Sequence, residues 1–216
     1  SRYVAGLLED LGLKAQVLHP PVRAWKIYNI VGENPSKDNL VVTVSRIDSG
    51  KQLWIIPFVA SKIKNAKFIL IGSLANRAYY EYLLRLSRIW KADNFKILVD
   101  LPSEELYRIL GKALIYLHTA HHEPFGIAVV ESMAAGCIPV VHRSGGPYID
   151  ILGGVEGLYG YSFGDVNELI DLLRDLLSRK QEELRELVGR ARRRALLFDE
   201  RNFMTKFRSI VERFIA

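Results

Sequence analysis

ALIYLHTAHHEPFGIAVVESMAAGCIPVVH, residues 113–142, contains a complete strand–helix–strand pattern. It opens with the buried-type run ALIYLHT (113–119), passes through a short polar loop into IAVVESMAAG (127–136), and ends in a second apolar run, CIPVVH (137–142). Continuous apolar runs predict strands covered on both faces, and the middle segment has helical spacing that Gly136 ends. The order predicts two parallel strands joined by a right-handed crossover.

The same alternation repeats upstream of this unit. NLVVTVS (39–45), AKFILIG (66–72) and NFKILVD (94–100) predict three more buried strands, with helical segments at KQLWIIPFVASKIK (51–64) and YYEYLLRLSRIWK (79–91). Repeated strand–helix alternation predicts an α/β fold built on a Rossmann-like, doubly wound parallel sheet followed by C-terminal helices. Such sheets bind ligands at the carboxyl ends of their strands.

Three local features refine this pattern. Pro57 lies inside 51–64 and should kink that helix or shift its start, because proline lacks a backbone N–H. Ser103 is expected to cap a helix over LPSEELYRILGK (101–112), with acidic residues following at the positive end of the helix dipole. KAQVLH (14–19) is predicted to form a short strand.

Composition limits the class of protein. The net charge of +6, from 30 basic and 24 acidic residues, favours a polyanionic partner such as nucleotide phosphate, nucleic acid or anionic lipid, and equally fits a solvated basic surface. The basic run GRARRR (189–194) likewise allows contact with anionic lipid or a solvated helix face. No aromatic residues are interleaved with basic clusters, so nucleic acid is not expected as a partner.

Cysteine content and hydropathy indicate the compartment. Cys137 is the only cysteine, so no internal disulfide can form, and its apolar surroundings predict a buried side chain. No apolar run approaches the roughly 18 residues of a membrane span, and the start carries no signal-peptide pattern. We therefore expect a cytoplasmic protein, with a peripheral position on the cytoplasmic face of a membrane as the alternative.

Familiar phosphate and metal motifs are missing from the sequence. There is no G-x-G-x-x-G after a strand, and SRIDSGKQ (45–52) lacks the first glycine of a P-loop. No two aspartates are separated by one residue, and His118, His121 and His122 have no cysteine or H-E-x-x-H beside them. We therefore expect no metal and no cofactor.

The loop and helix after residue 119 nevertheless suit a phosphorylated sugar. A helix that begins just after a parallel strand offers free N–H groups to phosphate, and Gly126 lets the backbone approach a ligand. Glu123 before the helix and Glu131 within it each present two acceptor oxygens that match a vicinal diol. Two diols on either side of one diphosphate describe a nucleotide sugar. Alternatively, Glu123 only favours the helix dipole and Glu131 is an exposed helix residue.

Longer motifs carry a family resemblance. EPFGIAVVESMAAG (123–136) resembles the E-x7-E signature of retaining GT-B glycosyltransferases, particularly glycosyltransferase family 4, the glycosyl transferases group 1. HRSGGPYIDIL (142–152) is similar to the Gly-Gly loop of that family, and residues 44–73 to its R-x4-K block. The motifs look most like those of eukaryotic α-1,2-mannosyltransferases that extend lipid-linked oligosaccharides from GDP-mannose. The resemblance covers about residues 16–216.

The resemblance implies roles for the charged residues. Glu123 would hold hydroxyls of the donor sugar, and Glu131 the hydroxyls of the ribose. Arg46 and Lys51 would neutralise the leaving diphosphate, which makes Arg46, Lys51 and Glu123 the candidate catalytic residues. Asp100 would line the base pocket, at a position where the family often has glycine.

The resemblance also implies backbone contacts with the donor. Phe125, Gly126 and Ile127 would offer backbone N–H groups to the sugar or phosphate. Gly145 and Gly146 would belong to the donor-binding loop. The family often has Pro-Ser where this chain has His118-Thr119 (118–119), a change that the mannosyltransferase-like relatives share.

A division of the chain and an activity follow from the resemblance. Residues 1–19 would be the tail of an N-terminal acceptor-binding domain plus linker, 20–200 the nucleotide-sugar-binding domain, and 201–216 a C-terminal helix. The enzyme would be retaining and metal-independent, and would transfer a hexose, with mannose from GDP-mannose favoured, to an acceptor hydroxyl that a membrane lipid carries. A UDP-sugar donor and a non-catalytic sugar-nucleotide-binding subunit are the alternatives. The chain alone is expected to bind donor and to transfer little.

Overall fold

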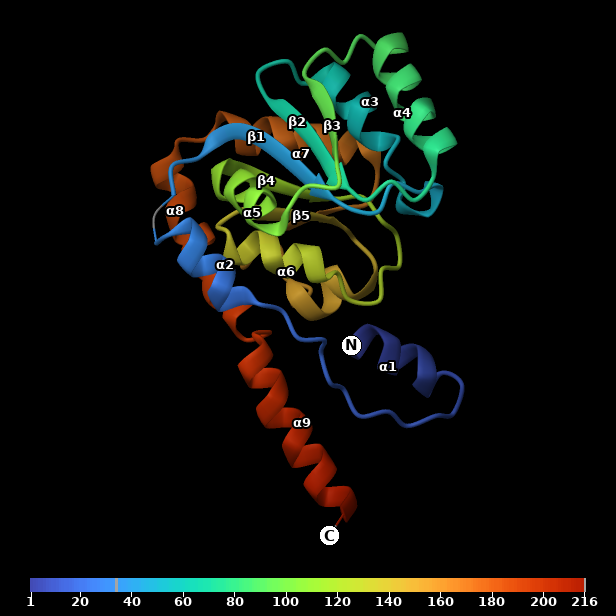
Figure 1. The fold of residues 1–216 in the computed structure, drawn as a ribbon, viewed down its shortest axis with the longest axis vertical. Helices are drawn as coiled ribbons and strands as arrows, with labels where there is room; N and C mark the ends of the chain where they lie inside the picture. The colour runs from blue at the N-terminus through green and yellow to red at the C-terminus, as the bar shows by residue number, and fades with distance from the viewer. Residues whose placement is uncertain (34, 216) are drawn as a thin grey trace.

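A computed structural model describes residues 1–33 and 35–215 and shows a six-stranded, fully parallel sheet in the order β3-β2-β1-β4-β5-β6 (Figure 1). The doubly wound α/β sheet is confirmed, and so are the five strands predicted between residues 39 and 142. The sixth strand, three residues at one edge, was not predicted. The strands are β1 (Asp38–Val44), β2 (Lys67–Gly72), β3 (Phe95–Val99), β4 (Ala113–His118), β5 (Ile138–His142) and β6 (Tyr161–Phe163).

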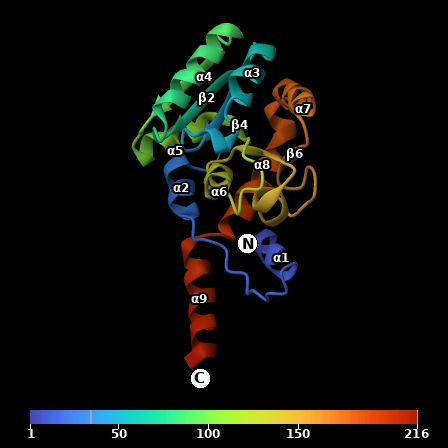
Figure 2. The same ribbon diagram turned by 90° about the vertical axis from the view of Figure 1, so that its right-hand side faces the viewer.

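Helices cover both faces of the sheet, so each central strand is buried on both sides (Figure 2). Successive residues of one strand enter different cores: Val41 packs in one apolar cluster and Val42 in the other, as do Ile115 and Tyr116. This is why the strand sequences are continuously apolar. One face carries α3 (Ile55–Lys62), α4 (Arg77–Ile89) and α7 (Val166–Ser178), and the other α2 (Ala24–Val31), α5 (Ser103–Lys112) and α6 (Ile127–Ala134).

Helix α8 (Gln181–Leu196) joins the two cores. Leu184 and Leu187 in its first half pack with the cluster under α3 and α7, whereas Ala191 and Ala195 pack with the cluster under α6. The helix therefore crosses from one face of the sheet to the other.

Two local predictions were wrong and one is confirmed. Pro57 shifts the start of α3 to Ile55, which places the proline in the first turn, where a backbone N–H has no helical acceptor. Ser103 does not cap α5: it is the first helical residue, and Pro102 holds the cap position without a side-chain hydrogen bond. Residues 14–19 form no strand.

Part of the basic run 189–194 packs against the protein itself, whereas Arg193 is exposed. Arg192 is 5% exposed, its guanidinium lies 3.9 Å from the ring centroid of Tyr28, and it donates to carbonyl oxygens at the ends of α2 and α6. Arg190 and Arg194 also donate to backbone carbonyl groups. These three side chains are therefore held by intramolecular contacts.

The two ends of the chain lie on the same side of the sheet, away from most of the core (Figure 1). Helix α9 (Glu200–Ile215) projects from the domain, and α1 (Arg2–Glu9) lies against the single π-helical turn η2 (Pro147–Ile151). The terminal helix was predicted to reach residue 216, which lies outside the described residues. Among the helices that the structure describes, none is long and apolar enough to cross a membrane.

The strand order creates a switch point between β1 and β4. These neighbours pair in register at Val41 with Ile115 and Val42 with Tyr116, yet the chain leaves β1 toward β2 and leaves β4 toward β5, in opposite directions along the sheet. The loops that follow the two strands therefore diverge, and open α/β sheets bind ligands at such a point; we call the space at these carboxyl ends the crevice.

Candidate functional site

The loop after β1 is fixed across the switch point by the end of β4. It closes in a short 3₁₀ turn, η1 (Ser49–Lys51), where the Asp48 carboxylate accepts a hydrogen bond from the Gly50 N–H at 3.0 Å. Thr119, just after β4, donates its hydroxyl to the carbonyl oxygen of Lys51 at 2.8 Å. The side chain of Lys51 is thereby held over the crevice.

Lys51 and Glu123 meet in this crevice. The Lys51 ammonium lies 2.5 Å from Glu123 Oε2, and the two side chains are 25% and 21% exposed. They come from loops on either side of the switch point and are 72 positions apart in the chain. A close, partly shielded pair of this kind is far less screened by water than a surface ion pair. The structure thus brings together two of the three predicted catalytic residues.

Arg46 is on the same loop but is not part of this pair. Its side chain is 70% exposed, and its nearest carboxylate is that of Asp48 at 3.9 Å. The guanidinium is therefore free to reach an anion at the open side of the crevice.

His118 is a buried side chain that lies beside Glu123. It is the last residue of β4, its ring lies 6.4 Å from that of Tyr116, and its Nε2 is 3.9 Å from Glu123 Oε2. Burial lowers the pKa of His118 to about 4, against the opposing effect of the Glu123 carboxylate. The imidazole is therefore neutral near pH 7.

The two glycines of the Gly-Gly loop pack directly on the backbone that carries Glu123. A Cβ on Gly145 would lie 2.5 Å from the carbonyl oxygen of Glu123, and one on Gly146 would lie 2.3 Å from that of Pro124. The Gly146 N–H donates to the Glu123 carbonyl at 2.8 Å. Gly145 also has a φ of 72°, in the left-handed region that favours glycine. These glycines let the loop support Glu123 from behind.

Helix α6 begins at the crevice with its first N–H groups uncovered. Gly126 holds the cap position with φ 93°, makes no side-chain cap, and no acidic residue follows in the first turn. Ile127 is 46% exposed, whereas the ring of Phe125 is buried against His19 and Phe198. Phe125 can therefore offer a ligand its backbone but not its side chain, and the helix end favours a negative group.

Glu131 lies farther along α6, facing α5. The hydroxyl of Tyr107 donates to Glu131 Oε1 at 3.3 Å, and burial raises the pKa of the Glu131 carboxyl. The reading of Glu131 as an exposed helix residue is therefore wrong. One carboxylate oxygen is held by Tyr107, and the other remains for a further donor.

Asp100 lies at the same edge of the sheet but not next to the Lys51–Glu123 pair. It follows β3, which β2 separates from β1, and its N–H donates to the carbonyl oxygen of Gly72. Its φ is 54°. This left-handed conformation explains why glycine suits the position, and aspartate is among the residues that tolerate it.

A buried carboxylate ties α1 to the loops of the crevice. Asp150 is fully buried and accepts hydrogen bonds from the backbone N–H of Arg2 at 2.6 Å and of Tyr3 at 3.1 Å, at the positive end of α1. His19 Nε2 lies 2.7 Å from the same carboxylate. The hydroxyl of Tyr3 in turn meets His122 Nδ1 at 3.1 Å, beside Glu123. His19 is thus a packing residue that helps to hold the Asp150 carboxylate.

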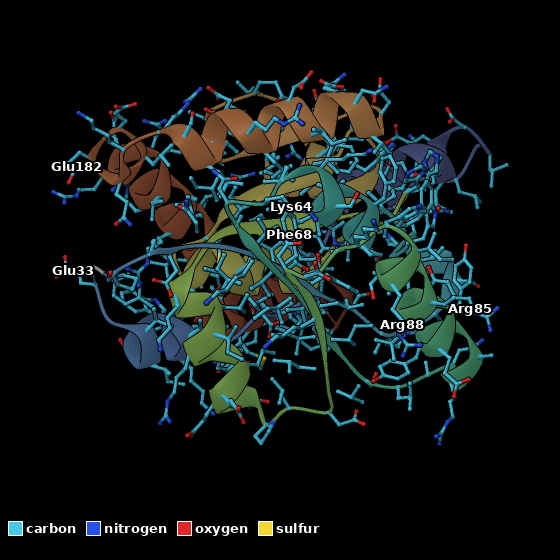
Figure 3. All side chains as sticks on the ribbon, turned by 90° about the horizontal axis from the view of Figure 1, so that it is seen from above. Glu33, Lys64, Phe68, Arg85, Arg88 and Glu182 are labelled. Atoms are coloured by element: carbon cyan, nitrogen blue, oxygen red, sulfur yellow. The ribbon has the colours of Figure 1, made fainter. Side chains whose placement is uncertain are left out.

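A large pocket lies at the opposite edge of the sheet and is a poor site for a diphosphate. It holds about 1110 Å³, and Lys64 and Phe68, both labelled in Figure 3, line it. Helices α3 and α5 end there, so the carbonyl ends of their dipoles disfavour an anion, and the lysines around the pocket offset those dipoles. Its lysines are Lys64, Lys67, Lys96 and Lys112.

The histidines near Glu123 do not converge into a group of metal ligands within the part of the chain that the structure describes. Within residues 1–33 and 35–215, no three side chains of His, Cys, Asp or Glu converge as metal ligands. His121 instead stacks on His142 with ring centroids 3.7 Å apart, and His142 Nδ1 contacts the hydroxyl of Ser144 at 2.7 Å.

The fold is that of the Rossmann-like half of a GT-B glycosyltransferase. Residues 28–194 match the family described as glycosyl transferases group 1, which is well over half of the chain. The chain therefore belongs to the glycosyl transferases group 1 family.

Within the family, the chain is similar to curated relatives that share one name. The chain is similar to the GDP-Man:Man(3)GlcNAc(2)-PP-Dol alpha-1,2-mannosyltransferase of Homo sapiens, with 35% identity over 154 residues, or 68% of this chain and 31% of that protein. The Dictyostelium discoideum protein of the same name is 25% identical over 216 residues, covering 92% of this chain and 42% of the relative. The chain thus spans about two fifths or less of the length of these relatives.

Solved structures share the fold. A glycosyltransferase from Rickettsia africae superposes with a TM-score of 0.80 at 16% identity, covering 94% of this chain and 58% of that one. Anabaena HepE in complex with UDP and glucose superposes with a TM-score of 0.70 at 19% identity, covering 90% and 52%.

Three residues near the crevice were not assigned a role from the sequence. Thr119 fixes Lys51, Tyr107 holds Glu131, and His118 stands beside Glu123. For Thr119 and His118 a signal existed, because they replace the Pro-Ser common in the family. Tyr107 gave none, since its contact depends on how α5 packs against α6.

Proposed function

We propose that this chain is the donor-binding part of a retaining, metal-independent glycosyltransferase that takes mannose from GDP-mannose and passes it to a hydroxyl of a lipid-linked oligosaccharide. The relatives named as GDP-mannose-dependent mannosyltransferases support the donor and the acceptor class. In this proposal residues 1–19 and 201–216 flank the donor-binding domain, and a further domain supplies the acceptor site. A cytoplasmic position at a membrane surface would give access to such an acceptor.

The observation that carries the proposal is the Lys51–Glu123 pair at the switch point. A nucleotide sugar has a negative diphosphate next to a hydroxyl-rich ring, and the crevice offers a cation next to an acceptor carboxylate. Arg46 and the start of α6 add positive potential on the diphosphate side. Cations placed where leaving-group charge develops lower the barrier to transfer.

The ribose and base would occupy the rest of this edge. Glu131 keeps one carboxylate oxygen for the ribose hydroxyls, and Asp100 stands at the end of β3, where a base would lie. Gly145 and Gly146 act in this proposal by supporting the backbone of Glu123 rather than by touching the donor.

Calorimetric titration of the chain with GDP, UDP, GDP-mannose and UDP-glucose tests the proposal. We expect GDP and GDP-mannose to bind most tightly, and Lys51→Ala to lose this binding. Lys64→Ala, at the opposite edge of the sheet, is the matched control and should bind as the unsubstituted chain does. Selective binding of UDP ligands would keep the site but change the donor. No binding of any of the four at millimolar concentration would refute the proposal.

A further inference from the structure

His118 carries a polar atom that the described structure leaves without a partner. Its side chain is 10% exposed, and its Nε2 is buried and forms no hydrogen bond with any residue in 1–33 or 35–215. The Glu123 carboxylate lies 3.9 Å away, beyond hydrogen-bond distance. Leaving a buried polar nitrogen without a hydrogen-bond partner costs free energy. A nearby group that can form this hydrogen bond is therefore a candidate partner of His118.

The ring of His118 is held in place while its neighbour is on a loop. His118 is the end of a central strand, paired with Val141 of β5, and its ring stacks near Tyr116. Glu123 belongs to the loop between β4 and α6. Of the two, the carboxylate is the one that can move, and a shift of about 1 Å would bring it within a normal N–H···O distance.

Lys51 and His118 face the same carboxylate oxygen. Lys51 occupies Glu123 Oε2 at 2.5 Å, while His118 Nε2 stands at 3.9 Å from that oxygen. If Lys51 turns to a diphosphate, Glu123 loses its cation within a partly buried site. A neutral imidazole N–H is the nearest donor able to take the place of the ammonium.

We propose that His118 is a positioning residue for Glu123: its Nε2–H takes over the carboxylate when Lys51 engages a nucleoside diphosphate. This inference rests on the proposed function, in which Glu123 binds the sugar. It adds His118 to Lys51 as a second residue that holds the Glu123 carboxylate. It gives the carboxylate one fixed partner from the strand, so that its other oxygen stays directed at the sugar hydroxyls.

Three substitutions separate this role from simple packing. In His118→Gln the amide nitrogen reaches the position of Nε2, in His118→Asn the position of Nδ1, and His118→Phe keeps the ring without any donor. Each would be titrated in the full chain with GDP and GDP-mannose, or with UDP and UDP-glucose if the unsubstituted chain prefers those. Thermal melts of each variant report on folding.

We expect His118→Phe and His118→Asn to bind both the nucleoside diphosphate and the nucleotide sugar roughly 10-fold or more weakly, the loss of one charge-assisted hydrogen bond. His118→Gln should restore most of the affinity. In a Glu123→Gln background, His118→Phe should cause no further loss, because the residue acts through the carboxylate.

Two outcomes would overturn the inference while leaving the proposed function intact. One is equal binding by the Gln and Asn variants, which remains decisive even if the Phe variant does not fold. The other is an undiminished effect of His118→Phe in the Glu123→Gln background, which would mean that the ring touches the ligand directly or only supports the strand. Failure of the unsubstituted chain to bind any of these ligands would refute the proposed function, and the inference with it.

Discussion

Gly146→Ala should damage the donor loop through sterics alone. Gly146 has ordinary helical dihedrals, φ −62° and ψ −35°, so an alanine there brings no backbone strain. Its Cβ, however, would lie 2.3 Å from the Pro124 carbonyl oxygen and 2.7 Å from the Phe125 Cα. Both are backbone atoms that no rotamer change can move. The Gly-Gly loop and the Glu123 loop must therefore separate by about 1 Å to reach ordinary contact distances.

The energetic consequence has two parts. Overpacking of a tight contact costs about 1–3 kcal/mol, and loss of the 2.8 Å bond from the Gly146 N–H to the Glu123 carbonyl costs a further ~1 kcal/mol. We expect the free energy of unfolding to fall by about 2–4 kcal/mol, which a domain of ordinary stability survives. Nucleotide-sugar affinity should fall at least tenfold, because the Glu123 carboxylate moves with its loop.

Gly153→Ala is the matched control. Gly153 has a φ of 76° but open space around the site of a Cβ, so the change adds backbone strain of about 1–2 kcal/mol without a clash. Urea unfolding and calorimetric titration of both variants give the comparison. Unchanged stability and unchanged affinity in Gly146→Ala would refute the steric argument. Equal loss of affinity in both variants would show that general destabilisation, and not the loop contact, controls binding.

Three further predictions concern single side chains. Lys51→Ala should lose about 1.5–3 kcal/mol of diphosphate affinity, measured by titration, while Lys64→Ala should lose none; equal losses would locate the anion elsewhere. Because burial holds the pKa of His118 near 4, below the 6.5 of an unfolded histidine, acid favours the unfolded chain. Stability should be full above pH 6.5 and fall by up to about 3 kcal/mol toward pH 4, and His118→Gln should flatten this slope in urea titrations at each pH; an unchanged slope would contradict the assignment. Lys37→Met should lower the free energy of unfolding by about 2–3 kcal/mol, since the buried Lys37 ammonium donates to two backbone carbonyls, one each in α5 and in the C-cap of α6; an unfolding midpoint equal to that of the unsubstituted chain would show that water replaces it.

The five strands between residues 39 and 142 could be predicted because each contains a short run of apolar residues. Runs such as 39–45 and 113–119 have apolar residues at successive positions, Leu40–Val42 and Ala113–Leu117, and a strand covered on both faces explains this in so few residues. The three-residue β6 carries no comparable run, and α2, which follows two prolines, was not predicted either. The structure of β6 depends on its pairing with β5, and that of α2 on packing against α5, α6 and α8, which no local pattern reports.

In the site, too, the sequence identifies single residues, whereas the contacts between them depend on the fold. The motif letters single out Lys51 and Glu123, but their 2.5 Å contact depends on β1 and β4 being neighbours with diverging loops. Gly146 was predicted to belong to a donor-binding loop, and only the structure shows that it packs on the backbone of the Glu123 loop. His118 was visible only as a departure from the common family pattern. Its partnerless nitrogen can be recognised only once the surrounding atoms are placed.

In the proposed function, the Lys51–Glu123 pair would serve both donor binding and sugar transfer. Cleavage of a glycosyl–phosphate bond leaves growing negative charge on the diphosphate and growing positive charge on the sugar ring, as in an oxocarbenium-like transition state. In the proposed function, the cation and the carboxylate that neutralise each other at 2.5 Å would stand on either side of that bond as the two charges that its cleavage requires. Their separation leaves the carboxylate in need of another hydrogen-bond donor, and His118 is the buried side chain nearest to supplying it. In this proposal Lys51 would face the diphosphate, which becomes more negative. Glu123, supported by His118, would face the sugar, which becomes more positive.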